Sequence, residues 1–423
     1  MKKMNKFIKV HLTFSLIKIP EVQLNNLTYL LFIIWGGLMN LNAGNDQKID
    51  TDLFNKAVEL SNKILIIDTH IDLPLRLKSN WEDVSKETAD GHFDFVRAKN
   101  GGLDAAFMSI YTEADLGESE EAFKNADALI NIVEKLAKIY PDKFEIALST
   151  EDVKNQFGKG IISLPMGMEN GSPINGSFER LKYFYDRGIR YITLTHSKSN
   201  HICDSSYDPN KRWKGLSPFG KSLIPEMNKL GIMVDISHVS DDAFYQAIEI
   251  SKVPVIATHS SCRYFTPDFE RNMSDDMIKK LAEKDGVIQI TFGSYFISGD
   301  FNRKSEEMDK YLTDNHLSRS SGEGKIYVDN YLKNNTMDPG TVSDVADHID
   351  HVVKLVGVDY VGLGSDFEGV NTLPKNLTDV SYVPYLIYEL LKRNYSESDI
   401  EKICSGNMLR VWKQVEDYAN SFK

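Results

Sequence analysis

The sequence has few cysteines and no excess of basic residues. Only Cys203, Cys262 and Cys404 occur among its 423 residues, and none belongs to a CxxC pair, so a disulfide framework is excluded. Lys and Arg number 49 against 61 Asp and Glu, which gives a formal net charge of −12. This acidity argues against nucleic acid as a partner, because such binding needs many Lys and Arg contacts to phosphates. It also argues against a polybasic role at a membrane surface.

The overall composition of the chain is that of a folded protein. Hydrophobic residues make up 42% of the chain and charged residues 26%, which excludes disorder or a coiled coil as the dominant state. The length allows one large barrel or two to three smaller domains.

The first 43 residues differ in composition from the rest. They contain five lysines and one acidic residue, and an apolar stretch at 27–39 is followed by Leu41-Asn42-Ala43. A basic start, an apolar stretch and a small residue follow one another in this order in secretory signals. We therefore predict a signal peptide or an N-terminal membrane segment over 1–43, a catalytic domain over 44–423, and export to the periplasm or the exterior. A buried N-terminal helix is the alternative.

The rest of the chain alternates short apolar runs with longer amphipathic stretches. The short runs, rich in Ile and Val, cover residues 64–67, 105–111, 161–165, 191–195, 232–237, 254–258, 287–292 and 360–364. Such runs are typical of strands buried on both faces. Helical patterns between them cover 120–139, 177–187, 240–250, 274–283 and 341–356. Eight strands that alternate with helices predict a single α/β domain, a (β/α)8 TIM barrel.

Two further segments complete this organisation. Residues 299–340 are polar, and we expect them to form a long excursion after the seventh strand, serving as a lid or a partner surface. Residues 380–392 and 396–418 have the pattern of closing C-terminal helices.

Polar residues capable of metal chemistry follow the predicted strands. They are His70, Asp72, Glu169, His196, His238, His259 and Asp366. In a barrel the carboxyl ends of the strands meet at one mouth, where the active site lies. Imidazole and carboxylate suit Zn²⁺ and related divalent ions. One carboxylate, such as Glu169, can also be shared by two ions about 3.5–4 Å apart. The pattern therefore favours a co-catalytic, hydrolytic metal site.

With these residues in view, the sequence resembles the renal (membrane) dipeptidases, zinc-dependent enzymes of the amidohydrolase-like TIM-barrel superfamily. The resemblance runs from about residue 64 to residue 412. It is carried by Asp68-Thr69-His70-Ile71-Asp72-Leu73-Pro74, by Gly101-Gly102, and by residues 191–197, 361–370 and 406–411. The separations of 27 residues from Glu169 to His196 and of 21 from His238 to His259 also resemble those of the family.

The resemblance implies a metal centre with two Zn²⁺ ions per chain. It places His70 and Asp72 on one ion and His238 and His259 on the other, with Glu169 bridging the two. Asn170 departs from the family pattern, which has Gly at this position, and Ser172 replaces a common His; both changes bear on the pocket wall.

The resemblance also implies roles for residues that do not hold metal. His196 would contact the substrate carbonyl, and Asp366 would carry the proton. Arg271 would bind the C-terminal carboxylate of the substrate, with Arg263 as the alternative, because the spacing from His259 to Arg271 is one residue longer than expected.

These roles imply zinc-dependent hydrolysis of dipeptides by a metal-bridging hydroxide, which releases free amino acids. Two alternatives stay open at this point. One is another binuclear metal-dependent hydrolase of the same barrel, acting on a cyclic amide, a lactone or an N-acyl amino acid. The other is a secreted binding protein that has lost catalysis. The dipeptide substrate is the implied partner; no stable protein partner is implied, and a homodimer is compatible with the sequence.

Overall fold

The structure is a computed structural model that describes residues 49–422. In this part of the chain the strands are parallel and form one sheet. The eight strands of the barrel are β1 (Ile67–Ile71), β2 (Ala105–Tyr111), β5 (Met166–Glu169), β6 (Ile189–Thr193), β7 (Met233–Asp235), β8 (Ile256–Ser260), β9 (Val287–Ile290) and β10 (Val361–Leu363). They pair in this order from β1 to β10.

The barrel closes between β1 and the segment that follows β10. The amide of Asp72 donates to the carbonyl of Phe367 at 2.9 Å, and the amide of Asp366 donates to the carbonyl of His70 at 3.1 Å. Ile71 and Phe367 form a parallel bridge at the same place. The predicted (β/α)8 fold is confirmed.

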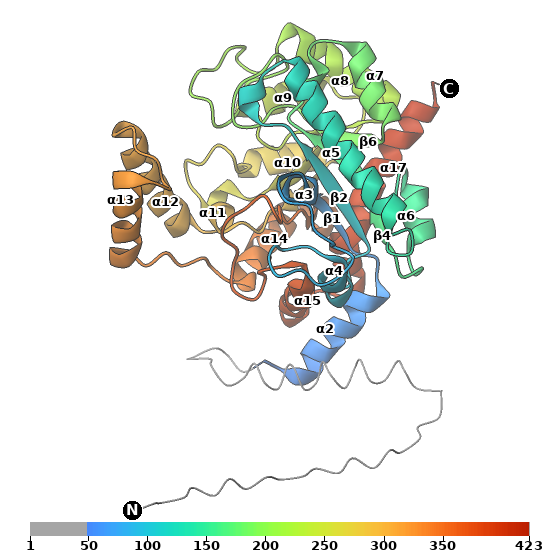
Figure 1. The fold of residues 1–423 in the computed structure, drawn as a ribbon. Coiled ribbons are helices and arrows are strands. Elements are labelled where there is room, and N and C mark those ends of the chain that lie inside the picture. The colour runs from blue at the N-terminus through green and yellow to red at the C-terminus, as the bar shows by residue number, and fades with distance from the viewer. Residues whose placement is uncertain (1–48, 423) are drawn as a thin grey trace, which may run out of the picture. The chain divides into compact units, whose positions relative to one another are not determined.

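Helices surround these strands (Figure 1). They are α2 (Thr51–Lys63), α3 (Leu73–Ser79), α4 (Phe95–Gly101), α5 (Glu120–Ile139), α6 (Thr150–Gln156), α7 (Phe178–Asp186), α8 (Pro218–Leu230), α9 (Asp241–Ile250), α10 (Asp275–Glu283), α14 (Val342–Val356), α15 (Val383–Lys392), α16 (Glu397–Glu401) and α17 (Asn407–Asn420). Ser240 and Ser274 accept hydrogen bonds from the amides of Ala243 and Met277, which fixes where α9 and α10 begin.

No helix of the described residues is long and apolar enough to cross a membrane, and the predicted segment 1–43 lies outside those residues.

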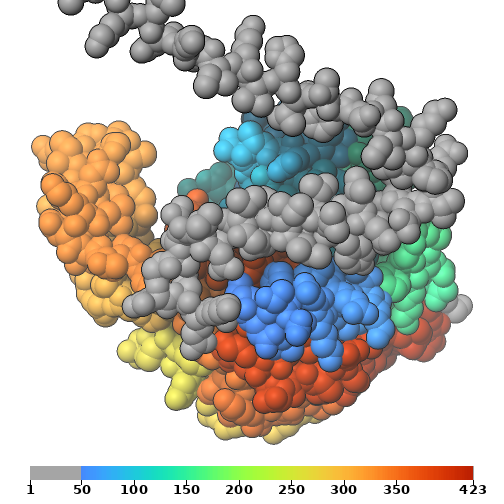
Figure 2. Space-filling view, turned by 90° about the horizontal axis from the view of Figure 1, so that it is seen from below, coloured from blue at the N-terminus to red at the C-terminus, as the bar shows by residue number. Residues whose placement is uncertain are grey.

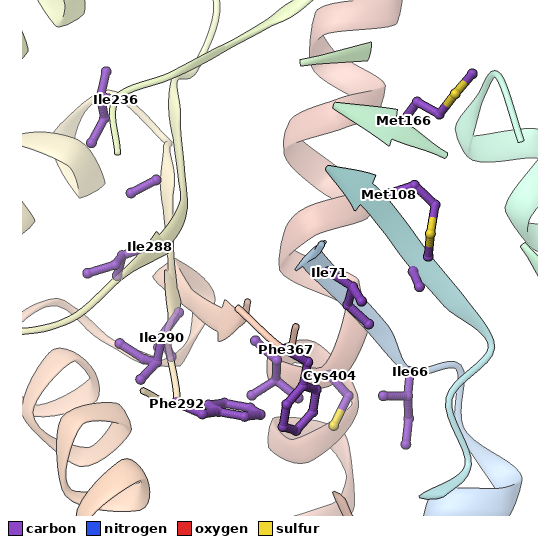
Figure 3. Packing of buried hydrophobic residues seen from close by; sticks show 14 of the residues in the cluster. Ile66, Ile71, Met108, Met166, Ile236, Ile288, Ile290, Phe292, Phe367 and Cys404 are labelled. Carbon is purple, nitrogen blue, oxygen red and sulfur yellow. The ribbon is translucent and has the colours of Figure 1, made fainter. Parts of the chain in front are cut away.

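The outer face of the sheet packs against these helices through aliphatic and aromatic side chains. Figure 3 shows Ile71 and Met108 from neighbouring strands, together with Phe292 and Phe367. The last two rings meet edge to face with their centroids 5.7 Å apart, a favourable aromatic geometry.

Helix α17 closes the end of the barrel at which the strands begin. Trp412 is fully buried there, and its ring lies 5.2 Å from Phe107 on β2, which in turn lies 5.4 Å from Tyr191 on β6. The opposite end, where the strands finish, is thereby the one left to the loops that carry polar residues. This confirms the predicted closing helix.

The first strand begins later than predicted. Residues 64–66 connect α2 to the barrel, and β1 runs over Ile67–Ile71 instead of 64–67. The polar residues Asp68, Thr69 and His70 are thus part of the strand. They can be buried there because each side chain has a hydrogen-bond partner inside the protein. Thr69, for example, donates to the carbonyl of Thr258 at 2.6 Å.

The third strand is split. The predicted run 161–165 contains β4 (Ile162–Leu164), while the strand that continues to the mouth is β5, immediately after Pro165. Both pair with β2. Because proline has no amide proton for the ladder, the break falls at this residue. A short strand not anticipated from the sequence, β3 (Phe144–Ile146), extends the sheet beside β4.

The polar excursion after the seventh strand is helical. Short helix α11 (Ser294–Ile297) leads into α12 (Gly299–Asp314) and α13 (Gly322–Asn334), which form a hairpin that projects from the barrel (Figures 1 and 2). Met308, Leu312 and Val328 make its own small core. Asn302 of α12 also donates to the carbonyl of Tyr295 at 3.2 Å, which ties the base of the hairpin to α11.

Candidate metal centre

Glu169 lies at the centre of a cluster of histidines at the mouth of the barrel. It is the last residue of β5, and its side chain is 5% exposed. One carboxylate oxygen, Oε1, lies 3.1 Å from Nε2 of His238 and 3.2 Å from Nε2 of His259. The other oxygen, Oε2, lies 3.3 Å from Nε2 of His70. One oxygen therefore faces His238 and His259 and the other faces His70, which is the geometry that a bridging carboxylate needs.

Two aspartates complete the side of His70. Asp72 follows β1, and its Oδ2 lies 3.5 Å from Nε2 of His70. Asp366 follows β10 and offers a carboxylate oxygen within 4.8 Å of ligand atoms of both residues. Strands β1 and β10 are joined at the closure of the barrel, which brings these three residues together.

His196 lies on the more exposed side of the cluster. It follows β6, its Nε2 lies 3.7 Å from Oε1 of Glu169, and its side chain is 22% exposed against 5% for His238. Tyr111 meets its ring edge to face at 5.0 Å. His196, His238 and Glu169 nevertheless form one of the three groups whose spacing could hold an ion; the other two are His70 with Glu169 and His259, and His70 with Asp72 and Asp366.

Three of the turns at the mouth contain a non-glycine residue in the left-handed region. The φ angles are 71° at Asn170, 69° at His238 and 65° at Asp366, and such conformations cost on the order of 1–3 kcal/mol each. Asn tolerates this region better than most residues, which explains how Asn170 fits a position where the family resemblance led us to expect Gly. Its Oδ1 also accepts hydrogen bonds from the amide and the hydroxyl of Ser172, so the two departures from the family pattern contact each other.

Charges within the cluster shift the pKa values of its members. Burial disfavours ionised Glu169, yet the surrounding imidazoles, His70 foremost, hold the pKa of this carboxyl well below its usual range. Burial also opposes a charge on His70, but Tyr191, Glu169 and Asp72 together raise its pKa well above that of free imidazole. In the protein without metal, a proton on His70 thus balances part of the carboxylate charge.

Four other groups at the mouth, His196, His238, His259 and Asp366, shift toward their neutral forms. Burial, with the nearby charge of Arg271, lowers the pKa values of His196 and His238. Burial also lowers the pKa of His259. For Asp366, burial and the negative charges of neighbouring carboxylates raise the pKa well above its ordinary value. Neutral imidazoles can bind metal, and a carboxyl with a raised pKa can carry a proton near neutral pH.

The donor set fits divalent cations. Nε2 of His70 and Oδ1 of Asp72 are buried and have no hydrogen-bond partner among the described residues. Nε2 of His238 and Nε2 of His259 approach to 2.9 Å, and both lie beside Oε1 of Glu169, where one ion can contact the two rings together. A buried polar atom without a partner is costly, and a cation bound between these atoms removes that cost.

Two arginines were candidates for binding a substrate carboxylate, and they differ in position. Arg271 is 3% exposed, and its guanidinium donates to Oγ of Ser260 at 2.8 Å and to the carbonyl of His259 at 2.7 Å. Its Nε has no hydrogen-bond partner in the part of the chain that the structure describes. Arg263 forms a bidentate pair with Asp241 at 2.6 and 2.8 Å. Arg271 is therefore the one beside the metal cluster.

Three neighbours of the cluster were not singled out from the sequence. The hydroxyl of Tyr191 lies 2.9 Å from Nδ1 of His70, the hydroxyl of Thr258 lies 2.8 Å from Nδ1 of His259, and Ser109 donates to Oε2 of Glu169 at 3.3 Å. Thr258 adjoins a candidate ligand, and Tyr191 opens the segment 191–197. For Thr258 and Tyr191, these positions are the only signals in the sequence.

The chain is similar to known proteins over most of its length. Residues 54–423 match the profile of the membrane dipeptidases, peptidase family M19. An uncharacterized dipeptidase of Schizosaccharomyces pombe is 32% identical over 372 residues, which cover 84% of this chain and 82% of the relative. The dipeptidase tcpJ of Claviceps purpurea is 32% identical over 340 residues, which cover 79% of this chain and 71% of the relative.

Solved structures show the same fold. The probable dipeptidase PvdM of Pseudomonas aeruginosa is 26% identical, with a TM-score of 0.79, over 88% of this chain and 100% of that one. The dipeptidase AC, described as a metallo peptidase of family M19, is 25% identical, with a TM-score of 0.69, over 83% and 98% of the two chains. The chain belongs to the membrane dipeptidase family, peptidase family M19, and is a metallo-dipeptidase.

Proposed function

We propose that this protein hydrolyses dipeptides with two zinc ions bound at the mouth of the barrel. His70 and Asp72 would hold one ion and His238 and His259 the other, with Glu169 shared between them. The observation that carries this proposal is the division of the Glu169 carboxylate, with Oε2 3.3 Å from His70 and Oε1 3.1 and 3.2 Å from His238 and His259.

Zinc, when bound, would lower the pKa of water from 15.7 to about 7 and so make a hydroxide nucleophile available at neutral pH. The protein's own groups would do the rest. Asp366 would accept the proton of the nucleophile and return it to the leaving amine, a task that suits its raised pKa. His196, neutral because burial lowers its pKa, would donate to the carbonyl oxygen as negative charge develops on it.

Arg271 would limit the substrate to two residues. A guanidinium binds a carboxylate through charge-assisted hydrogen bonds, and Arg271 contacts the carbonyl of His259, a proposed ligand, at 2.7 Å. In a dipeptide the free carboxylate belongs to the residue directly after the scissile bond, so an arginine beside the ions would reach it. A longer peptide has an amide there instead, which offers no negative charge.

The experiment compares three substrates of one sequence: the dipeptide Ala-Ala, its C-terminal amide, and the tripeptide Ala-Ala-Ala. Zinc-loaded protein is expected to cleave the dipeptide with a kcat/KM at least about tenfold higher than the other two, because a charge-assisted hydrogen bond contributes roughly 1.5–3 kcal/mol. Equal rates on the dipeptide and its amide would contradict the role of Arg271. Failure to cleave any of a library of dipeptides would contradict the proposed function.

A further inference from the structure

A chain of hydrogen bonds connects a buried carboxylate with one of the proposed ligands. Asp235, the last residue of β7, is fully buried. Its Oδ2 accepts a hydrogen bond from the hydroxyl of Thr258 at 2.6 Å. The oxygen of the same hydroxyl lies 2.8 Å from Nδ1 of His259. Asp235 thus reaches His259 through Thr258 without touching the cluster around Glu169.

The carboxylate of Asp235 fixes the direction in which these hydrogen bonds point. Among residues 49–422, the side chain of Asp235 contacts only donors, which are the amides of Ser237 and Thr258 at 3.0 and 2.9 Å and the hydroxyls of Thr193 and Thr258 at 2.5 and 2.6 Å. An ionised carboxylate is an acceptor only. The single hydroxyl proton of Thr258 must therefore point at Asp235.

This direction determines the tautomer of His259. Since the hydroxyl proton of Thr258 is used, its oxygen can only accept, and Nδ1 of His259 must carry a proton. A neutral imidazole then has its lone pair on Nε2, the atom that lies 3.2 Å from Glu169 and 2.9 Å from Nε2 of His238. His259 is thereby prepared to bind an ion before any ion arrives.

The two sides of the cluster differ in this respect. The hydroxyl of Tyr191 donates to the carbonyl of Thr69 at 3.1 Å and so accepts from Nδ1 of His70, which makes the partner of His70 a neutral one. That side has the carboxylate of Asp72 in direct contact. The side of His238 and His259 has no carboxylate of its own beyond the shared Glu169, and Nδ1 of His238 has no partner among the described residues.

We infer that Asp235, acting through Thr258, is a positioning residue for the ion held by His238 and His259. It holds His259 in the Nδ1–H tautomer and supplies negative charge one hydroxyl away. This inference rests on the proposed function, because it concerns one of the two proposed ions. Partners of this kind beyond the ligands typically change metal affinity by roughly 10–100-fold.

The test replaces single hydroxyl groups. Thr258→Val removes the connection between Asp235 and His259, and competition with a chromophoric chelator is expected to show one of two zinc equivalents bound about 10–100-fold more weakly. Thr258→Ser keeps the hydroxyl and should restore the affinity. Thr193→Val is the matched control, since it removes another hydroxyl from the same oxygen, Oδ2 of Asp235, without contact to His259; both equivalents should bind as in the wild type.

A second measurement needs no variant. Long-range ¹H–¹⁵N NMR of the zinc-free protein labelled at histidine should show His259 in the Nδ1–H form. Wild-type affinity for both equivalents in Thr258→Val, equal weakening in Thr193→Val, or an Nε2–H tautomer of His259 would each overturn the inference. A wild-type protein that binds no zinc would instead overturn the proposed function.

Discussion

His196 and His238 provide a sharp test of which histidines hold metal. Both follow strand ends and both approach Oε1 of Glu169, but His238 lies at 3.1 Å and His196 at 3.7 Å. The side chain of His196 is 22% exposed and that of His238 is 5% exposed. We therefore expect His238 to contact an ion and His196 to contact the substrate.

The two substitutions should have different consequences. Without its imidazole, His238→Ala leaves one proposed ion with only His259 and the shared Glu169, so this variant should lose close to one zinc equivalent and activity together. His196→Ala removes no proposed ligand and should keep both equivalents. Its kcat should fall by roughly 10²–10³, or about 2.7–4 kcal/mol, the loss typical of one oxyanion donor.

The assay pairs elemental analysis of the purified variants with steady-state kinetics on one dipeptide. His201→Ala serves as the control, because His201 lies in the loop after the same strand as His196 but pairs with Glu118 at 3.5 Å. It should retain metal and kcat. If His196→Ala loses an ion as completely as His238→Ala does, His196 is a ligand and the assignment of roles is wrong.

Three further predictions concern the substrate, the pH dependence and the N-terminus. Arg271→Met should raise KM for a dipeptide by roughly 10–100-fold. Arg263→Met should leave KM unchanged, because Arg263 is paired with Asp241. Equal KM values in the two variants would contradict the role of Arg271 in binding the substrate carboxylate. The pKa of His70 is raised, so zinc must displace a proton from this ring, and the affinity for the ion on the side of His70 and Asp72 should fall as the pH falls below that pKa. The expected fall is about tenfold per pH unit for one proton. Calorimetric zinc titrations at several pH values measure this affinity, and a pH-independent value would contradict the prediction. We also propose export, so N-terminal sequencing of protein from the periplasmic or secreted fraction should begin near Gly44, and an intact Met1 found only in cytoplasm would contradict it.

Much of the fold could be predicted from the sequence because the barrel strands are buried on both faces. The run 105–111 and the helix 120–139 match β2 and α5. The first strand was displaced because its three central residues, Asp68 to His70, are polar, and periodicity does not distinguish a polar strand that faces an interior site from a loop. The helices α12 and α13 were missed as helices because their few buried side chains, such as Met308 and Val328, lie in a largely polar segment.

The candidate site was predictable to the extent that strand ends meet at one mouth. Position along the chain brought His70, Asp72, Glu169, His238 and His259 to one place, and the structure gives the distances between them. The contacts of Tyr191 with His70 and of Asp235 with Thr258 join different strands. Such contacts depend on the register and side-chain directions of the folded barrel, which a single sequence does not contain.

Zinc content and activity, measured on the same preparation, decide whether this protein is a zinc-dependent dipeptidase. Protein purified without chelator should contain close to two zinc equivalents per chain, as expected for two sets of ligands that share Glu169. Chelation should abolish hydrolysis of a simple dipeptide such as Ala-Ala, and zinc should restore it. A metal content near zero, with dipeptide hydrolysis that survives chelation, would contradict the account.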